Sequence, residues 1–375
     1  MRIVIEKNSL FEGLQRIYNV VPQKPTLPIL SNFLLTVSGD ENDPGLSISG
    51  TDMDMSITTK LGCSAEGEGS ITVNAKRFIS IVRELPEGEV AVEIDGEKVK
   101  VEFSGGQSSM MGMSSSDFPP LKESIDGVPV VLPGDEFFDI VDKTSFAVST
   151  DRTRMTLTGV YVRLSSDDMV MVSTDGHRLS LFEKRLDITT DKVTEAIVPP
   201  KALNHAGRIF YSDAKLQRIV FGQGVMLFDF ESTTVFTKLI EGPYPDFRQV
   251  IPLDNSKHIV ISTERLESAV RRVSVLSSSI THQVRLALNP GRMEVRTTNA
   301  DIGGEARESL EIDYDGESIV IGFNAVFLQE ILRKIDTEEV LLEIEAPTIA
   351  CILKPVYKEK KGEHIYLIMP LRLNE

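Results

Sequence analysis

The amino-acid sequence predicts an α+β protein built from three repeats of one domain, and a recurring strand–turn pattern is the first reason. A short strand of alternating apolar residues runs into Thr-Asp or Thr-Asn at Thr51, Thr174 and Thr298. Asp and Asn suit such turns because their side chains bond nearby backbone groups. Successive copies lie 123 and 124 residues apart, so three units account for all 375 residues.

A second pattern, in which a strand leads into a helix, recurs at the same spacing. Its apolar residues Phe78, Leu203 and Leu328 stand 125 residues apart. Asn74 and Asn324 precede the first and third copies. Asparagine is a preferred N-cap because its side chain accepts a hydrogen bond from a free amide of the first turn. The pattern therefore predicts the same helix in each third.

Each third also opens with an amphipathic helix, which completes the predicted domain. Apolar residues recur at i, i+3, i+4 and i+7 after Ser9, Asp135 and Thr263, which we expect to be N-caps. Every third then holds two helices, each followed by short strands that form antiparallel sheets. The predicted domains are residues 1–127, 128–254 and 255–375.

The composition excludes a helical membrane span and gives no sign of a metal or cofactor site. Hydrophobic residues make up 41% of the chain, but no apolar run approaches the roughly 18 residues that cross a bilayer. The chain opens on an alternating strand, Met1–Glu6, rather than on a signal peptide. Cys63 and Cys351 lack metal-ligand spacing and are expected to be buried thiols in a reducing cytoplasm.

The net charge of −16 argues against ordinary DNA binding, because phosphate affinity rests on Lys and Arg. The charges are unevenly distributed, however. Six predicted helix windows hold 13 Lys or Arg and 10 Asp or Glu, a net charge of +3, so the remaining residues carry −19. Solvated helix faces explain this difference equally well, and the acidic third window departs from it. The windows are residues 7–20, 74–85, 134–149, 199–211, 263–276 and 324–336.

Similar helices on one side of a repeat protein can line a ring, and simple geometry sets its size. Helices pack about 9 Å apart, so twelve side by side give a circle roughly 35 Å across. Subtracting one helix diameter of about 10 Å leaves a hole near 25 Å. A DNA duplex is roughly 20 Å wide and fits this hole. Six helices leave too little room, so two chains are needed to encircle DNA.

The best catalytic candidate in the sequence is the turn Asp175–Arg178, where Asp175 and His177 could form an acid–base pair. The five histidines are scattered, and the chain contains no HExxH motif, no nucleophile elbow and no phosphate-cradling glycine loop. A histidine beside a turn glycine is more often structural or part of a binding surface. The sequence therefore predicts a protein that is not an enzyme, with a DNA- or sugar-processing enzyme as an alternative.

Four motifs occur in a distinctive order: Pro25–Leu30 (PTLPIL), Thr174–Leu179 (TDGHRL), Gly242–Arg248 (GPYPDFR) and Met369–Leu373 (MPLRL). Together they span the chain and resemble the bacterial sliding clamp family, the beta subunit of DNA polymerase III. The resemblance implies a head-to-tail homodimeric ring of six similar domains, with helices inside and sheets outside. Such a DNA sliding clamp holds DNA topologically and is a processivity factor for polymerases.

The resemblance also implies a partner-peptide pocket between the second and third domains. Aliphatic and Met side chains would anchor the peptide, with His and Arg at the rim. Gln249 stands where many relatives carry a basic residue, and Asn374–Glu375 extends beyond the Met-x-x-Arg-Leu ending, so both bear on partner preference. The implied pocket residues are Leu157, Thr174, Gly176, His177, Arg178, Leu179, Pro245, Val250, Ile368, Met369, Pro370, Leu371, Arg372 and Leu373.

For DNA, the resemblance and the helix charges point to basic side chains that touch phosphates without reading bases, as sliding requires. The expected contacts are Lys24, Arg77, Arg152, Arg154, Lys201 and Arg271. The ring is expected to close between the first domain of one chain and the third domain of the other. Val275 and Leu276 would contribute apolar side chains to that dimer interface.

The resemblance also implies which partners to expect. They are double-stranded DNA, a second copy of the chain, a clamp loader, the catalytic subunit of the replicative polymerase, and other polymerases or repair proteins that carry short peptide motifs. No cofactor is expected, and nothing in the chain could bind the ATP that loading requires. The expected location is the cytoplasm, in association with the nucleoid. A specialised or resistance-type clamp copy with altered partners is a further alternative.

Overall fold

The strands and helices of each third follow one order, which is the repeat predicted from the sequence. In the computed structural model, each third runs strand, helix, four strands, helix and three strands, with one extra short strand in the first third. The structure describes residues 1–38, 45–212, 214–359 and 362–373. The tail residues Asn374 and Glu375, expected to bear on partner preference, lie outside these ranges. The α+β class and its threefold repeat are confirmed.

Internal contacts divide the chain into two compact units, and the division falls inside the middle third. Unit 1 comprises Met1–Gly134, Thr189–Lys192 and Lys201–Leu239. Unit 2 comprises Asp135–Ile188, Val193–Pro200 and Ile240–Glu375. The domain limits predicted after residues 127 and 254 do not coincide with this division, so they stay a prediction.

Unit 1 contains a five-stranded sheet, in the order β5-β1-β7-β8-β9, and an eight-stranded sheet, in the order β10-β15-β16-β17-β4-β3-β2-β6. Antiparallel pairing of β17 with β4 places Thr233 opposite Thr59, so strands of the first and middle thirds share one sheet. The strands are β1 (Arg2–Glu6), β2 (Asn32–Ser38), β3 (Gly45–Thr51), β4 (Met55–Gly62), β5 (Ser64–Glu66), β6 (Gly69–Asn74), β7 (Glu89–Asp95), β8 (Lys98–Phe103), β9 (Gly106–Met111), β10 (Gly127–Val130), β15 (Leu216–Gly222), β16 (Val225–Phe230) and β17 (Thr233–Lys238).

Unit 2 likewise contains an eight-stranded sheet, β14-β11-β12-β13-β25-β24-β23-β18, and a four-stranded sheet, β21-β20-β19-β22. Pairing of β13 with β25 places Leu179 opposite Leu367 and joins the middle third to the last. The strands are β11 (Val160–Leu164), β12 (Asp168–Thr174), β13 (Arg178–Arg185), β14 (Thr194–Val198), β18 (Lys257–Ser262), β19 (Gln283–Asn289), β20 (Arg292–Asn299), β21 (Gly304–Glu311), β22 (Ile319–Asn324), β23 (Glu339–Ile344), β24 (Cys351–Pro355) and β25 (Glu363–Ile368).

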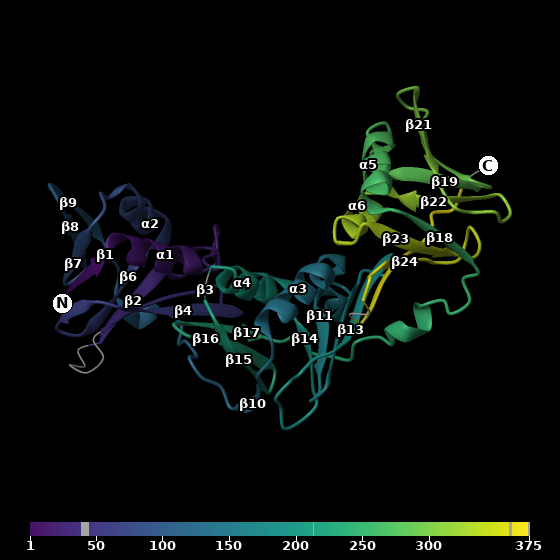
Figure 1. Cartoon of the computed structure of the whole chain (residues 1–375). Coiled ribbons are helices and arrows are strands. Elements are labelled where there is room, and N and C mark those ends of the chain that lie inside the picture. Colours follow the sequence, from purple (N-terminus) through teal and green to yellow (C-terminus); the bar gives the residue numbers. More distant parts are fainter. Residues whose placement is uncertain (39–44, 213, 360–361, 374–375) are drawn as a thin grey trace. The chain divides into compact units, whose positions relative to one another are not determined.

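Two pairs of α-helices pack together beside the sheets, α1 against α2 and α5 against α6 (Figure 1). The α-helices are α1 (Lys7–Tyr18), α2 (Ala75–Glu84), α3 (Gly134–Thr144), α4 (Pro200–Phe210), α5 (Thr263–Ser274) and α6 (Ala325–Leu332). Short 3₁₀ helices are η1 (Pro28–Ser31), η2 (Ser115–Asp117), η3 (Ser145–Ala147), η4 (Met155–Thr158) and η5 (Phe247–Val250).

Each α-helix buries the apolar stripe that its sequence predicts. Leu10, Leu14 and Ile17 of α1 are inaccessible to solvent, as are Leu266 and Val270 of α5. Residues at this spacing share one helix face. Burial of each such side chain contributes about 1.5–3 kcal/mol, so packing against the sheets holds these short helices in place.

The two asparagine N-caps are confirmed. The side chain of Asn74 accepts a hydrogen bond from the amide of Arg77 at 3.1 Å at the start of α2. The side chain of Asn324 accepts one from the amide of Val326 at 2.9 Å at the start of α6.

The other three predicted N-caps are wrong. Ser9 lies inside α1, which begins at Lys7 directly after β1. Asp135 lies in the first turn of α3. Thr263 is the first residue of α5, and Ser262, the last residue of β18, caps that helix instead. In α1 and α5 the helix follows its strand without a break, so the strand end rather than the first polar residue fixes the start.

The two thiols differ in burial. Cys351 is buried, as predicted, and burial raises the pKa of its thiol. The prediction is wrong for Cys63, which lies between β4 and β5 and is only half-buried.

Candidate functional site

An apolar pocket of about 530 Å³ lies in unit 2, over the strands that join the middle and last thirds. Its floor belongs to a cluster of buried apolar side chains from β12, β13, β24 and β25. Strand side chains alternate between the two faces of a sheet, so the floor uses every second residue. The pocket is lined by Leu157, Thr174, Gly176, Arg178, Leu179, Pro245, Asp246, Phe247, Gln249, Val250, Ile251, Pro252, Ile349, Ala350, Leu367 and Met369.

The segment before the last third covers part of this apolar face and leaves the pocket beside it. Tyr244 stacks on Tyr161 with ring centroids 5.4 Å apart, and Phe247 lies 6.2 Å from Tyr161. Burial raises the pKa of Tyr244. The side chain of Asp246 caps η5 and also accepts a hydrogen bond from Gln249 at 2.9 Å. The covering segment is therefore held in place by the stacked aromatic rings and by the Asp246 cap of η5.

The turn between β12 and β13 forms one wall and is closed by its own hydrogen bonds. The hydroxyl of Thr174 accepts from the amide of Gly176 at 3.1 Å and donates to the carbonyl of Arg178 at 2.6 Å. Oδ1 of Asp175 accepts from the amides of His177 and Arg178 at 2.8 and 3.0 Å. Gly176 has a φ of +88°, which favours glycine, so the Thr-Asp-Gly order predicted this turn for a physical reason.

The C-terminal segment forms the opposite rim and is fixed at two points. The amide of Met369 donates to the carbonyl of His177 at 2.8 Å, and the amide of Leu371 donates to the carbonyl of Gly322 at 2.8 Å. A Cβ at Gly322 would lie 2.6 Å from the side chain of Leu373. Leu371 and Leu373 therefore bind the end of the chain to β22 rather than line the pocket.

The structure brings most of the predicted pocket residues together. Those that line the pocket are Leu157, Thr174, Gly176, Arg178, Leu179, Pro245, Val250 and Met369, whereas His177, Ile368, Pro370, Leu371, Arg372 and Leu373 do not. Ile368 points into the core on the other face of β25. His177 stacks on Phe327 with centroids 6.4 Å apart. For Asp246 and Phe247 the motif Gly242–Arg248 offered a signal, and for Leu367 the alternation Ile365-x-Leu367 did. The lining residues that sequence reasoning missed are Asp246, Phe247, Ile251, Pro252, Ile349, Ala350 and Leu367.

Asp175 and His177 show no catalytic arrangement. The Asp175 carboxylate is engaged by two turn amides and by Nε of Arg178 at 3.2 Å. Across the described residues, no group of three or more His, Cys, Asp or Glu side chains could hold a metal ion. The turn is thus built as a wall and not as an acid–base pair.

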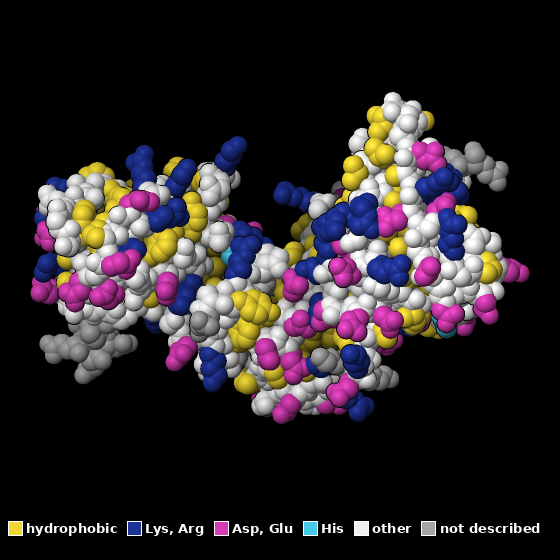
Figure 2. Space-filling model, turned by 45° about the horizontal axis from the view of Figure 1, so that its top comes forward, with side chains coloured by type: hydrophobic (Ala, Val, Ile, Leu, Met, Phe, Trp, Pro, Cys, Tyr) yellow, Lys and Arg dark blue, Asp and Glu magenta, His cyan; other side chains and the backbone are white. Residues whose placement is uncertain are grey.

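The six predicted DNA contacts are all exposed to solvent. In unit 1, Lys201 pairs with Asp52, while Lys24 lies in the loop before η1 and Arg77 in the first turn of α2. Basic and acidic side chains are intermixed over the face of the molecule seen in Figure 2.

The three DNA contacts predicted in unit 2 lie on two different elements, a loop and the helix α5. Arg154 pairs with Asp151 at 3.3 Å, and Arg271 pairs with Glu267 at 3.3 Å on α5. Arg152 lies in the same loop as Arg154. Nη1 of Arg154 is 2.9 Å from the position that a Cβ would take at Gly176, so this arginine adjoins the wall of the apolar pocket.

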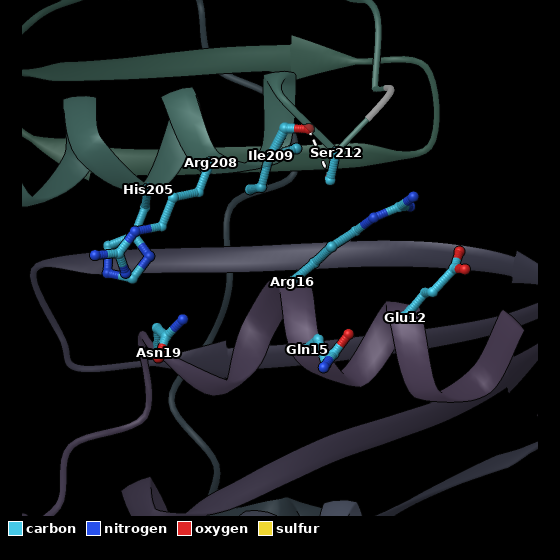
Figure 3. Close-up of a pocket in the computed structure, with 8 residues that line it drawn as sticks. All are labelled: Glu12, Gln15, Arg16, Asn19, His205, Arg208, Ile209 and Ser212. Atoms are coloured by element: carbon cyan, nitrogen blue, oxygen red, sulfur yellow. Dashed lines mark hydrogen bonds between the residues drawn. The ribbon is translucent and has the colours of Figure 1, made fainter. Parts of the chain in front are cut away.

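A second, polar hollow of about 440 Å³ lies in unit 1 between α1 and α4 (Figure 3). Within the part of the chain that the structure describes, neither Arg16 nor Arg208 pairs with a carboxylate. Burial, together with the charges of Lys201 and Arg208, lowers the pKa of His205 to about 4. We call this site the helix hollow; it is lined by Glu12, Gln15, Arg16, Asn19, His205, Arg208, Ile209 and Ser212.

The predicted interface residues lie at the C-terminal end of α5. The side chain of Val275 is 77% exposed, and Leu276 is half-buried. Ile280 and Ile302, which sequence reasoning missed, are 85% and 64% exposed. A Cβ at Gly304, the first residue of the edge strand β21, would contact both Ile302 and Leu276, so these side chains are neighbours.

None of the helices in the described ranges combines the length and apolar character needed to cross a membrane.

Comparisons with known proteins cover the chain from end to end. Models of the N-terminal, central and C-terminal domains of the DNA polymerase III beta subunit match residues 1–122, 131–246 and 248–372. The beta sliding clamp of Caulobacter vibrioides is 33% identical over 385 residues, and that of Pseudomonas putida is 29% identical over 375 residues. Both alignments cover 100% of each chain.

Solved structures of sliding clamps also match this chain over its full length. A DnaN sliding clamp from Pseudomonas aeruginosa, bound to griselimycin, matches with a TM-score of 0.90 and 27% identity over 100% of both chains. The DNA polymerase sliding clamp of Bacillus subtilis matches with a TM-score of 0.89 and 26% identity, again over 100% of both chains. Three family models in tandem, full-length relatives and the shared fold place this chain in the DNA polymerase III beta subunit family, the beta sliding clamps.

Proposed function

We propose that this sliding clamp tethers its partners through the apolar pocket of unit 2. Its family membership makes the chain a processivity factor of DNA replication, which acts as a ring-shaped homodimer and is not an enzyme. The alternative of an enzyme that uses Asp175 and His177 is therefore wrong. One observation carries the proposal: a pocket of about 530 Å³ with an aliphatic floor opens beside a turn that is fixed by its own hydrogen bonds.

The pocket suits a short peptide with two apolar anchors, of the kind Gln-x-x-Leu/Met-x-Phe. Leu179, Pro245, Val250 and Met369 would bury those anchors. Burial of one Leu and one Phe side chain contributes roughly 3–6 kcal/mol before the cost of ordering the peptide. Such a balance gives a micromolar contact that several partners can exchange. Those partners would be the clamp loader, the catalytic subunit of the replicative polymerase, and other polymerases or repair proteins.

DNA would be held by enclosure and by a few phosphate contacts. The contacts proposed are Lys24, Arg77, Arg152, Arg154, Lys201 and Arg271, to which the helix hollow adds Arg16 and Arg208. Figure 3 shows Arg16 of α1 and Arg208 of α4 on opposite sides of this hollow. With a net charge of −16, the chain would bind linear DNA weakly, so an ATP-driven loader would place the ring.

Closure of the ring would pair an edge strand of the first domain with one of the third. β9 and β21 end their sheets in the described structure, and the backbone groups along such edges are free to pair with another chain. Leu276 and Ile302 lie beside the start of β21, and with the exposed side chains of Val275 and Ile280 they would supply the apolar part of the contact.

The pocket is tested by peptide binding to a variant that keeps the fold. Val250→Ala with Met369→Ala removes two half-exposed lining side chains and should weaken binding of a labelled Gln-x-x-Leu-x-Phe peptide at least tenfold. Val260→Ala, which makes the same Val-to-Ala change outside the pocket on β18, is the control for Val250→Ala. Wild-type affinity in the double variant, with the dimer mass unchanged, would reject the pocket.

A further inference from the structure

The Arg178 side chain, which lines the apolar pocket, is held from two distant parts of the chain. Its Nε donates to Oδ2 of Asp175 at 3.2 Å, and its Nη2 donates to the carbonyl of Phe146 at 3.2 Å. Its Nη1 donates to the carboxylate of Glu330 on α6. All three guanidinium nitrogens therefore donate hydrogen bonds. The side chain is only 9% exposed, so these bonds lie in a nearly water-free position.

Two aromatic rings lie against this guanidinium. Its Cζ lies 4.5 Å from the ring centroid of Phe327 and 5.2 Å from that of Phe146, distances at which cation–π attraction operates. Phe327 and Glu330 are three residues apart on α6 and therefore share one face of that helix. α6 thus holds Arg178 through both a ring and a charge.

Arg178 transmits the position of α6 to the wall of the pocket. Asp175, which accepts from its Nε, also accepts the two amides that close the turn. The carbonyl of His177 in that turn holds the amide of Met369 at the opposite rim. A shift of the guanidinium would therefore displace the wall at Gly176 and the rim at Met369 together.

Glu330 supplies the charge that balances this arginine without taking part in the pocket itself. A buried guanidinium requires opposite charge or acceptors around it. The Asp175 carboxylate already accepts hydrogen bonds from two turn amides. Glu330 provides the second carboxylate that pairs with the charge of Arg178. The Glu330 side chain is 41% exposed and is not among the lining residues.

We propose that Glu330 is a positioning residue that sets the orientation of Arg178 and, through it, the shape of the pocket that binds partner peptides. This inference rests on the proposed peptide binding at the apolar pocket. It makes α6, a helix outside the pocket, a determinant of partner affinity.

The test is a double-mutant cycle on the full-length dimer, with fluorescein-labelled Gln-Ala-Ser-Leu-Ala-Phe as the probe. Glu330→Gln should weaken binding roughly threefold to thirtyfold, an effect within the range found for partners in one hydrogen-bond network. Because Glu330 acts through Arg178, adding Glu330→Gln to Arg178→Met, which has no charge left to pair, should cause no further loss. A role confined to folding would instead give additive effects.

Controls separate the possible failures. Glu338→Gln removes an exposed carboxylate, 4.0 Å from Lys358, and should leave affinity at the wild-type value. Glu330→Asp keeps the charge on a shorter side chain and should recover part of the affinity, which also covers the case in which Glu330→Gln fails to fold.

Two outcomes would overturn the positioning role: wild-type affinity in Glu330→Gln, or an additive cycle. If Val250→Ala with Met369→Ala also leaves binding unchanged, the peptide pocket itself is wrong. If that variant loses binding while Glu330→Gln does not, only the positioning role is rejected.

Discussion

Gly176 is the residue on which the wall of the apolar pocket depends. Its φ of +88° is one that side chains rarely adopt, and a Cβ there would approach Nη1 of Arg154 to 2.9 Å. The backbone conformation therefore favours glycine at this turn, and a Cβ there would also push the flexible Arg154 side chain aside. Gly224 offers a comparison, because its φ is +68° but nothing lies within 4 Å of a Cβ there.

We predict that Gly176→Ala and Gly224→Ala each lower the free energy of unfolding by about 1–3 kcal/mol, the cost of a strained residue. Only Gly176→Ala should also weaken peptide binding, because it moves the wall and Arg154. Thermal unfolding and fluorescence anisotropy on the same samples measure the two effects. Equal peptide affinities in the two variants would contradict the structural account of the turn.

A second prediction concerns His364, which lies between Phe182 and Tyr366 with ring centroids 4.7 and 4.2 Å away. Burial lowers its pKa to about 3, and the charge of Lys143 contributes. The unfolded chain, with a histidine pKa near 6.5, binds the proton more readily, so stability falls as the pH drops below about 6.5.

His364→Phe should remove this dependence. Neither ring nitrogen of His364 has a hydrogen-bond partner in the described structure, so an apolar ring fits the site. The loss of unfolding free energy between pH 6.5 and pH 4 should shrink by on the order of 3 kcal/mol. Denaturant titrations at both pH values measure it, and a comparison at pH 8 isolates the effect of packing. Parallel pH profiles for the two proteins would refute the explanation.

The pocket shows how far single residues can be predicted from sequence. The turn from Thr174 to Leu179 and the rim at Met369 are recognisable because each depends on a local motif. Ile368 follows the same motif, yet alternation along β25 directs it into the core and Leu367 into the pocket. Ile349 lies about 170 residues from the turn, and only the order β13-β25-β24 brings it near, so no local pattern could reveal it.

At the scale of elements, we predict that the arginines on the facing helices α1 and α4 contribute measurably to DNA binding. Arg16→Ala with Arg208→Ala removes two cations from the helix hollow. Removing one phosphate contact should reduce the slope of log K against log salt by about 0.9, so in the double variant the slope should fall by up to about 1.8. Binding to a short duplex at several low salt concentrations gives this slope.

The matched control removes two cations from strands instead. Arg218→Ala with Arg292→Ala produces the same net charge but changes arginines of β15 and β20 that already contact Asp229 and Glu294. Its salt slope should stay at the wild-type value. An equal fall in both double variants would assign the effect to net charge rather than to the helix hollow.

The elements themselves were largely predictable, because helix and strand periodicities recur three times. Two asparagine caps were found, since Asn74 and Asn324 each end a strand and begin a helix. The cap at Ser9 was wrong because α1 follows β1 without a loop. Edge strand β9 has a Ser- and Met-rich sequence without strand alternation, so it depends on the ladder with β8 rather than on its own pattern.

For the whole molecule, we predict that apolar-to-charged substitutions at the joint of the ring will dissociate the dimer. Ile280→Asp with Ile302→Asp places two carboxylates at the proposed joint and should shift the protein to monomers at micromolar concentration, because an unpaired buried charge is costly. Sedimentation velocity measures the mass. Val260→Asp, on a strand outside the joint, should leave the dimer intact. A wild-type protein that sediments as a monomer or a tetramer would contradict the ring.

Enclosure also predicts how the loaded protein behaves on DNA. After loading, the clamp should remain on nicked circular DNA through gel filtration and should leave when the circle is cut, because its charge of −16 gives little direct affinity. Blocking both ends of the linear DNA with bound protein should restore retention. Release from intact circles at the same rate as from cut DNA would exclude topological holding.

The edges β9 and β21 belong to different sheets, so the joint that we propose between two copies is heterologous and not self-complementary. A heterologous joint closes only when each copy turns by the angle that the ring requires, and any other angle yields an open helical fibre. Small changes in how the edges meet could therefore convert a ring into a polymer of unlimited length. Variants that bend either edge should be judged by light scattering and electron microscopy as well as by dimer affinity, because filaments would be the signature of a misdirected joint.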